Sequence, residues 1–232
     1  MPPIALIIPA AGAGTRMKAA SRKPFLAVEG ETLLNLTLER FLGVAGIAQV
    51  VLALNPKDYE RKDEIIFSVS PLGVTDVVEG GESRTESVAN ALAALNDAVE
   101  IVLIHDAVRP FVSKKVIEGV AEAAARSGAA IAAVPMKDTA KRVEGRVVSG
   151  TLPRRGLYAA QTPQGFRRDL IEKAYAGRSP EAYTDDAALV EEAGGAVEVV
   201  ESSPLNFKIT TPEDLELASA VLRAVRAGRL HF

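Results

Sequence analysis

The stretch IALIIPAAGAGTRMKAASRKPFL, residues 4–26, joins a short apolar run to a loop rich in glycine and basic residues. The run at 4–9 has the length and composition of a buried β-strand. Glycines let backbone N–H groups approach phosphate oxygens, so a cationic glycine loop directly after a strand is typical of a phosphate-binding site. A strand-to-helix turn with solvated basic residues is the alternative. Both interpretations predict the start of an α/β fold.

The rest of the chain continues with short apolar runs that alternate with amphipathic segments. Further strands are predicted at 50–54, 74–80, 100–106, 129–135 and 196–202, and helices at 32–42, 56–66, 84–95, 113–128, 168–177, 184–194 and 211–228. Continuous apolar strands between helices are typical of a parallel sheet covered on both faces. We therefore expect an α/β protein with a Rossmann-like, mostly parallel sheet.

Residues 136–160 interrupt this pattern. Polar and apolar residues alternate there, with turns at 144–145 and 149–150, which predicts a β-hairpin arm rather than a linker. The length of 232 residues suits one domain, so we expect a single domain over 1–232 that contains the arm. At this length we expect no second, fused enzyme in the chain.

Composition excludes several classes of site and partner. The chain has no cysteine and two histidines, His105 and His231, which excludes thiolate chemistry and a multi-histidine metal site. A net charge of −3 argues against a nucleic-acid surface. No apolar run approaches the roughly 18 residues of a membrane span, and no signal peptide is recognisable. We expect a cytoplasmic protein with no membrane or nucleic-acid partner.

The glycine spacing decides which phosphate loop the chain carries. Gly12 and Gly14 begin a dinucleotide fingerprint, but Met17 occupies its third glycine position, and the Walker pattern is absent as well. What remains is A-A-G-x-G-x-R-M followed by Lys23. Arg16 and Lys23 would neutralise charge at an attacked α-phosphate, which predicts a nucleoside triphosphate as the ligand.

Five motifs in order make the chain resemble the 2-C-methyl-D-erythritol 4-phosphate cytidylyltransferase family of the non-mevalonate isoprenoid pathway. They are the loop PAAGAGTRM…KPFL, GGESRTESV (80–88), HDAVRP (105–110), KDTAKR (137–142) and NFKITTPEDL (206–215). The resemblance covers essentially the whole chain. It implies a nucleotidyltransferase that joins CTP to methylerythritol phosphate and releases pyrophosphate. It also implies magnesium, held largely by the CTP phosphates, and a homodimer formed through the 136–160 arm.

The resemblance assigns a role to each matching residue. Arg16 and Lys23 would stabilise the transition state. Arg154 and Lys208 would position methylerythritol phosphate, and the R-x-G-L pattern selects Arg154 over the neighbouring Arg155. The implied nucleotide contacts are Ala10, Ala11, Gly12, Gly14, Gly81, Glu82, Ser87, Asp106 and Ala107. The implied substrate contacts are Asp106, Arg109, Thr139, Arg154, Thr184 and Lys208. Glu82 stands where the family often has aspartate.

Asp106 follows a predicted strand, and ligands of open α/β sheets lie at the carboxyl ends of strands. It is therefore the candidate to orient substrate hydroxyls or to help hold magnesium, which needs few protein ligands. Helix or turn capping is the alternative for Asp106 and for Thr184, and Ser83 is expected to cap the helix of its motif. His105 is expected to be structural rather than catalytic.

The implied nucleophile is the substrate's own phosphate, so the protein needs to supply charge stabilisation and positioning rather than a nucleophile. Three alternatives remain. A cytidylyltransferase for another polyol phosphate, such as ribitol 5-phosphate, would share the mechanism. A catalytically inactive nucleotide-binding module would share the fold, although it would be expected to lose some of the four catalytic cations. A dinucleotide-dependent dehydrogenase is disfavoured by Met17.

Overall fold

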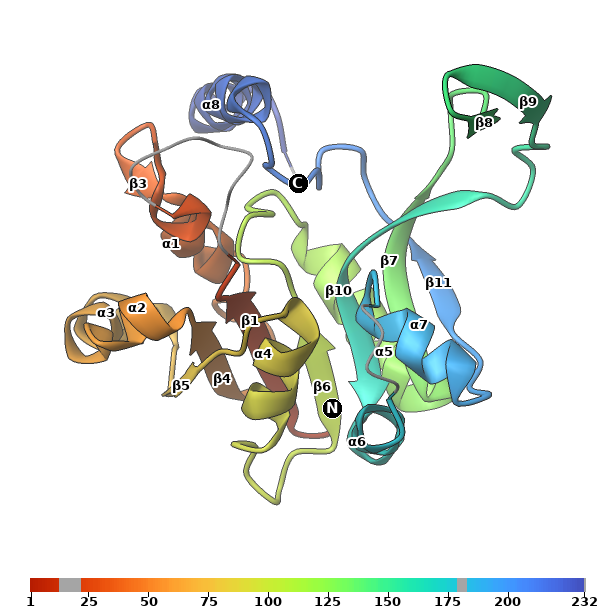
Figure 1. Cartoon of the computed structure of the whole chain (residues 1–232). Coiled ribbons are helices and arrows are strands. Elements are labelled where there is room, and N and C mark those ends of the chain that lie inside the picture. Colours follow the sequence, from red (N-terminus) through yellow and green to blue (C-terminus); the bar gives the residue numbers. More distant parts are fainter. Residues whose placement is uncertain (13–21, 179–182, 232) are drawn as a thin grey trace.

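The computed structural model describes residues 1–12, 22–178 and 183–231. Within them a seven-stranded sheet has the order β11-β7-β10-β6-β1-β4-β5 (Figure 1). Its strands are β1 Ile4–Ala10, β4 Ile47–Leu54, β5 Asp76–Glu79, β6 Ile101–Ile104, β7 Ala129–Pro135, β10 Tyr158–Arg167 and β11 Glu198–Glu201. All neighbouring strands pair in parallel except β10, which is antiparallel to β6 and β7. The expectation of a mostly parallel α/β sheet is confirmed.

Alternation along β1 divides the core into two layers. Leu6 and Ile8 pack on the face covered by α1 Leu33–Glu39, α3 Lys62–Val69 and α5 Lys114–Ser127. Ala5 and Ile7 pack on the opposite face, under α4 Arg84–Leu92, α6 Arg168–Ala176 and α7 Asp186–Glu192. Both faces of β1 are therefore buried, which explains why its sequence reads as a continuous apolar run.

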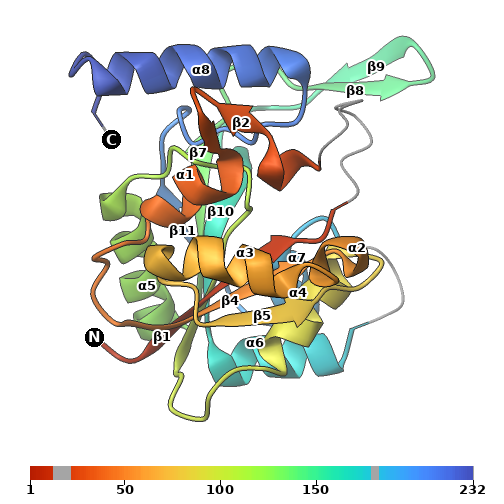
Figure 2. The same cartoon turned by 90° about the vertical axis from the view of Figure 1, so that its left-hand side faces the viewer.

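Helix α8, Pro212–Arg226, lies at the end of the molecule beyond the carboxyl ends of the parallel strands (Figure 2). Thr211 and Asp214 form the expected capping box at its start. Ala218 and Leu222 pack with Leu33 of α1 and Val28, forming a small third core. Val28 belongs to a short antiparallel pair, β2 Ala27–Val28 and β3 Glu31–Thr32, which the sequence pattern did not predict.

Two further elements differ from the sequence-based expectation. The helix expected over 56–66 is divided into α2 Pro56–Tyr59, capped by Asn55, and α3. Strand β10 was not predicted as a strand of the main sheet, since Pro163 and its polar neighbours do not show a strand pattern. The register shift between Ala160 and Gln164 accommodates this segment beside β7.

The predicted hairpin exists as β8 Lys141–Glu144 paired with β9 Val147–Thr151. It projects away from the sheet between β7 and β10 (Figure 1). Val143, Val147 and Val148 are 51%, 71% and 57% exposed, so the hairpin presents apolar side chains to its surroundings. In the described part of the chain, no helix has the length and apolar composition needed to cross a membrane.

Candidate active site

A cavity of about 240 Å³ opens at the carboxyl ends of β1 and β6. This is where ligands bind in open α/β sheets. Its lining is drawn from several separate segments. The lining residues are Pro9, Ala10, Ala11, Gly12, Lys23, Pro24, Arg84, Ser87, Asp106, Ala107, Val108 and Lys208. Seven of the residues expected to bind nucleotide or substrate therefore surround one space: Ala10, Ala11, Gly12, Ser87, Asp106, Ala107 and Lys208. Lys23, in the short helix Lys23–Phe25, joins them.

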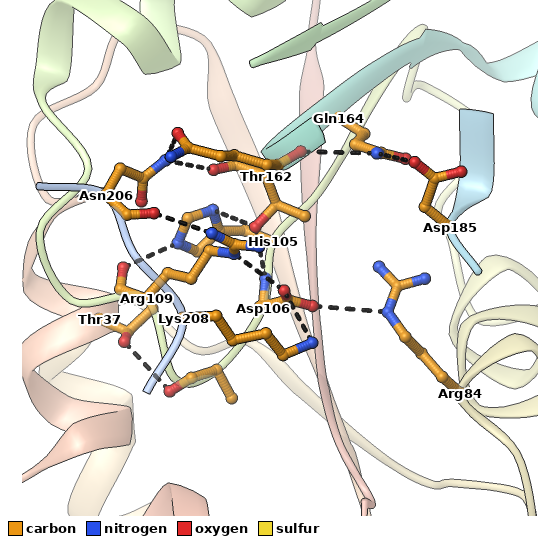
Figure 3. A network of polar contacts seen from close by, with 12 residues as sticks. Thr37, Arg84, His105, Asp106, Arg109, Thr162, Gln164, Asp185, Asn206 and Lys208 are labelled. Atoms are coloured by element: carbon orange, nitrogen blue, oxygen red, sulfur yellow. Dashed lines mark hydrogen bonds and ion pairs between the residues drawn. The ribbon is translucent and has the colours of Figure 1, made fainter. Parts of the chain in front are cut away.

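Asp106 is the centre of this site, because three cations surround its carboxylate (Figure 3). Its Oδ2 lies 3.0 Å from Arg109 Nε and 3.1 Å from Lys208 Nζ, and its Oδ1 lies 3.5 Å from Arg84 Nε. Burial would raise the pKa of Asp106, but the three cations outweigh burial and hold that pKa well below its usual range. Asp106 is therefore an anion at every working pH.

The turn after β6 is held by a directed chain of hydrogen bonds through His105. The Arg109 carbonyl can only accept, so His105 Nε2 carries the proton and donates to it over 3.1 Å. His105 Nδ1 is then an acceptor, and the Thr162 hydroxyl donates a hydrogen bond to it over 3.1 Å. Thr162 Oγ1 in turn accepts from the Asp106 backbone N–H over 3.0 Å. Full burial lowers the pKa of His105 to about 4, so the ring is neutral, as these bonds require.

The other side of the same turn is fixed by α1 and by the segment before α8. Thr37, fully buried in α1, donates its hydroxyl proton to the Ala107 carbonyl over 3.1 Å. Arg109, 9% exposed, donates Nη1 to the Asn206 carbonyl over 2.8 Å. Asn206 Nδ2 donates to the Thr162 carbonyl over 2.8 Å. The segment that carries Lys208 is thus tied to the turn that carries Asp106.

The glycine turn before α4 packs directly on the nucleotide loop. A Cβ at Gly80 would lie 2.6 Å from Ala11 Cβ, so this position requires glycine for close approach. Ser87 accepts from the Gly81 N–H over 3.1 Å and donates to the Ser83 carbonyl over 2.8 Å. Ser83 forms the expected cap with Glu86.

A second cavity shares Arg84, Asp106 and Lys208 with the first and extends toward β10 and α7. It brings Arg109 and Thr184, two expected substrate contacts, to one space. Its remaining lining residues are Ala160, Gln161, Thr162, Gln164 and Asp185. Asp185 caps α7, whereas capping was one alternative for Thr184. Asp185 also accepts from Gln164 Nε2 over 2.9 Å.

Some of the expected site residues line neither cavity of this chain. Gly81 and Glu82 belong to the turn before α4, where Glu82 is exposed. Thr139 and Arg154 are exposed near the hairpin, where Arg154 donates to the Lys137 carbonyl. Two more expected residues, Gly14 and Arg16, lie outside the described part of the chain.

Sequence reasoning assigned no role to Arg84, Thr162, Gln164, Asp185 or Asn206. Arg84 and Asn206 stand inside two of the five motifs, so motif membership was the signal that could have identified them.

The small number of carboxylates in the site limits which metal ion it could bind. Among the described residues there is no cluster of three or more histidine and acidic side chains suited to a metal. Asp106 is the one acid in the described lining of the first cavity, and both of its oxygens face cations: Oδ2 faces Arg109 and Lys208, and Oδ1 faces Arg84. The site therefore fits a cation that takes at most one protein carboxylate, Asp106, and most of its ligands from phosphates and water, as magnesium does.

Comparisons with known proteins agree over nearly the whole chain. The family model of 2-C-methyl-D-erythritol 4-phosphate cytidylyltransferase (IspD) matches residues 4–224. The enzyme of that name from Acidobacterium capsulatum is 45% identical over 94% of this chain and 96% of the relative. The crystal structure of the enzyme from Thermus thermophilus has a TM-score of 0.78 at 39% identity, covering 95% of this chain and 99% of the other. A 4-diphosphocytidyl-2C-methyl-D-erythritol synthase from Anaerococcus prevotii has a TM-score of 0.82 at 33% identity, covering 96% of each chain.

Proposed function

Since the chain belongs to the 2-C-methyl-D-erythritol 4-phosphate cytidylyltransferase family, we propose that its two cavities hold CTP and 2-C-methyl-D-erythritol 4-phosphate on either side of Asp106. The protein is a nucleotidyltransferase that makes 4-diphosphocytidyl-2-C-methyl-D-erythritol and pyrophosphate. The observation that carries the assignment of the two cavities is that Arg84, Asp106 and Lys208 line both of them. A group bound in one space is thereby next to a group bound in the other.

The reaction needs charge stabilisation rather than a protein nucleophile. A phosphate oxygen of methylerythritol phosphate attacks the α-phosphorus of CTP, forming one P–O bond. The bond from the α-phosphorus to the bridging oxygen breaks, and pyrophosphate leaves with its electron pair. Lys23 reaches the first cavity beside Gly12, where it would face the phosphates. A cation about 4 Å from developing charge contributes roughly 4 kcal/mol at an effective dielectric near 20.

The nucleotide would lie over the glycine-rich turns. Backbone N–H groups near Ala10, Ala11 and Gly12 would meet phosphate oxygens, together with Gly14 and Arg16 from the resemblance. The turn that Ser87 holds, with Gly81 and Glu82, would read the cytosine, and Asp106 and Ala107 would contact the ribose side. Close packing of Gly80 on Ala11 supports this placement, since it fixes the two turns against each other.

Methylerythritol phosphate would occupy the second cavity. Arg109 and Lys208 would bind its phosphate, while Thr184 and Asp106 would contact the hydroxyls. Asp106 would help to hold magnesium together with the triphosphate, and the metal would supply charge neutralisation at the phosphates. Because a nucleoside triphosphate is an intracellular substrate, we also place the protein in the cytoplasm.

Arg154 and Thr139 would act from a partner subunit. We infer one nucleotidyltransferase domain over 1–232 whose 136–160 arm embraces a second copy. Both residues are exposed and line neither cavity of their own chain, and the arm presents Val147 at 71% exposure. Such apolar exposure on a thin hairpin is typical of a protein–protein contact.

Mixed dimers test the shared site. Lys23→Ala and Arg154→Ala subunits are each expected to be nearly inactive alone. If Lys23 and Arg154 of one site come from different chains, a mixed dimer has one intact site and one doubly altered site. Random mixing at equal amounts would then restore about a quarter of wild-type activity, since about half of the dimers are mixed. No recovery despite proven subunit exchange would show that both residues act within one chain.

Pyrophosphate release tests the substrates. CTP, UTP, ATP and GTP are offered in turn with magnesium, against methylerythritol phosphate and ribitol 5-phosphate. We expect release with CTP and methylerythritol phosphate. Preference for ribitol 5-phosphate would move the protein to the alternative substrate, and CTP binding without release from any pair would indicate an inactive nucleotide-binding module.

A further inference from the structure

The reaction described above assigns no role to Arg84. It is the first residue of α4, directly after the glycine turn, and the Ser83–Glu86 capping box fixes this first turn. Its guanidinium points away from the helix toward Asp106 (Figure 3) and also reaches Asp186. Nη2 donates to Asp186 Oδ2 over 2.7 Å, and Nε lies 3.5 Å from Asp106 Oδ1. One side chain therefore connects the glycine turn, the start of α7 and the central carboxylate.

Asp186 is a rigid anchor for this contact. It is 1% exposed, and the Tyr175 hydroxyl donates to its Oδ1 over 2.6 Å. Gln164 Oε1 accepts from the backbone N–H groups of Asp186 and Ala187, at 3.1 and 3.0 Å. Asp186 is therefore held through its side chain and its backbone, and its ion pair with Arg84 restrains the guanidinium.

The charge of Arg84 is as fixed as its position. Burial alone would lower the pKa of Arg84, but Asp186 and Asp106 outweigh burial, so that pKa is raised. The side chain is 27% exposed and lines both cavities. A permanent cation thus stands at the boundary between the two spaces, with its planar fork engaged on one side by Asp186.

We propose that Arg84 is a positioning residue that holds Asp106 and the α7 end of the second cavity in register with the glycine turn of the first. This proposal rests on the proposed function, since it concerns how the two substrates are aligned. Without the Nε contact, Asp106 Oδ1 loses the cation that faces it, while Oδ2 keeps Arg109 and Lys208. The carboxylate would then rotate toward that pair, and the second cavity would lose its alignment with the CTP α-phosphate.

The test uses two variants. Arg84→Met keeps the aliphatic bulk and removes the guanidinium group, and Arg84→Lys keeps the charge. We expect kcat/KM for methylerythritol phosphate to fall by about 10- to 100-fold in Arg84→Met, because small misplacements near the reacting groups cost that much. The CTP dissociation constant, measured calorimetrically without the second substrate, is expected to change far less. Arg84→Lys should recover only part of the loss, because its single ammonium cannot span Asp186 and Asp106.

Arg168→Met is the matched control. Arg168 also opens a helix, α6, is 22% exposed and makes an ion pair of 2.7 Å with Glu172, but it lines neither substrate cavity. Its kinetics should stay within about twofold of wild type, as for most substitutions away from a site. Asp186→Asn, which retains Arg84 but weakens its anchor, should lower kcat/KM for methylerythritol phosphate in the same direction.

Three outcomes would overturn the proposal. Unchanged kcat and KM in folded Arg84→Met would show that the contact is dispensable. A loss confined to thermal stability, equal to that of Arg168→Met, would make Arg84 structural. A loss confined to CTP affinity would make it a nucleotide contact. Failure of the proposed function would look different, since the wild-type protein would then release no pyrophosphate from CTP and methylerythritol phosphate.

Discussion

Acid should destabilise this protein through His105, and the size of the effect follows from its burial. His105 is 0% exposed, and burial lowers its pKa from 6.5 to about 4 in the folded chain. In the unfolded chain the ring titrates near its ordinary value. Between these two values the unfolded state binds a proton that the native state does not bind. The free energy of unfolding therefore falls as pH falls, beginning near the unfolded pKa and ending near the native one.

The magnitude of this loss follows from the two pKa values. A pKa difference of one corresponds to about 1.4 kcal/mol, so the full effect below the native pKa is about 3 kcal/mol. Lowering the pH from about 7.5 to about 5.5 crosses only part of that interval and should remove about 1 kcal/mol. Asp106 does not add to this loss, because the cations around it keep its pKa well below that window.

Urea unfolding at fixed protein concentration over this pH range measures the effect. His105→Gln retains a donor toward the Arg109 carbonyl and removes the titrating ring, so its stability should lose the His105 share of the pH dependence. His231→Gln, at an exposed position, controls for the other histidine. Identical pH slopes in the wild type and His105→Gln, or an imidazole NMR titration of His105 near its ordinary pKa, would refute the buried neutral ring.

Lys23→Ala should lower kcat by about a hundredfold or more in the pyrophosphate assay, as loss of a charge-stabilising donor does; near wild-type turnover would remove Lys23 from the mechanism. Asp106→Asn removes the anion that Arg109 and Lys208 face and leaves Arg84 with Asp186 alone, so we expect a loss of about 3–5 kcal/mol in unfolding free energy, together with slower turnover; unchanged stability would mean that the cations are well solvated. Gly80→Ala should cost about 1–3 kcal/mol in unfolding free energy and weaken CTP binding in calorimetry, because the new Cβ meets Ala11 at 2.6 Å. Gly177→Ala, where the nearest atom to the added Cβ would lie at an ordinary van der Waals distance of 3.7 Å, is its control.

The parallel core could be predicted from local pattern because burial on both faces leaves a simple signature. Ile4–Ala10 reads as apolar throughout, since each face of β1 meets a helix layer. The start of α8 could be predicted as well, because Thr211 and Asp214 cap it through contacts within one turn. Both signals are local, so the sequence carries them directly.

Strand β10 shows why the rest could not be predicted. Gln161, Thr162 and Gln164 are polar, and Pro163 lacks the N–H that a sheet ladder uses, so the segment reads as a turn. Yet these three polar side chains are at most 7% exposed, and all of them line the second cavity. Rules based on local sequence pattern fail here because these residue types suit the cavity that they line rather than the strand that contains them.

The same limit applies to the site. Asp106 could be placed at a strand end, and Arg109 lies only three residues from it, but its other two cations come from positions 84 and 208, and contacts at such separations have no periodic signature. Motif resemblance selected Arg109 and Lys208, and it left Arg84 without a role although the residue stands in the same motif as Ser87. The assignment of Gly14 and Arg16 stays a prediction.

The direction of β10 links the site to the arm. Because β10 is antiparallel to β6, Gln164 pairs with Ile104, and the residues that precede it lie past the end of β6, beside His105 and Asp106. Tyr158, at the start of β10, pairs with Pro135 at the end of β7. The arm therefore leaves and re-enters the sheet at the same edge as the cavities. A parallel strand in this place would have required the chain to cross to the opposite edge of the sheet before it re-entered, so the short connection through the arm depends on the antiparallel direction of β10.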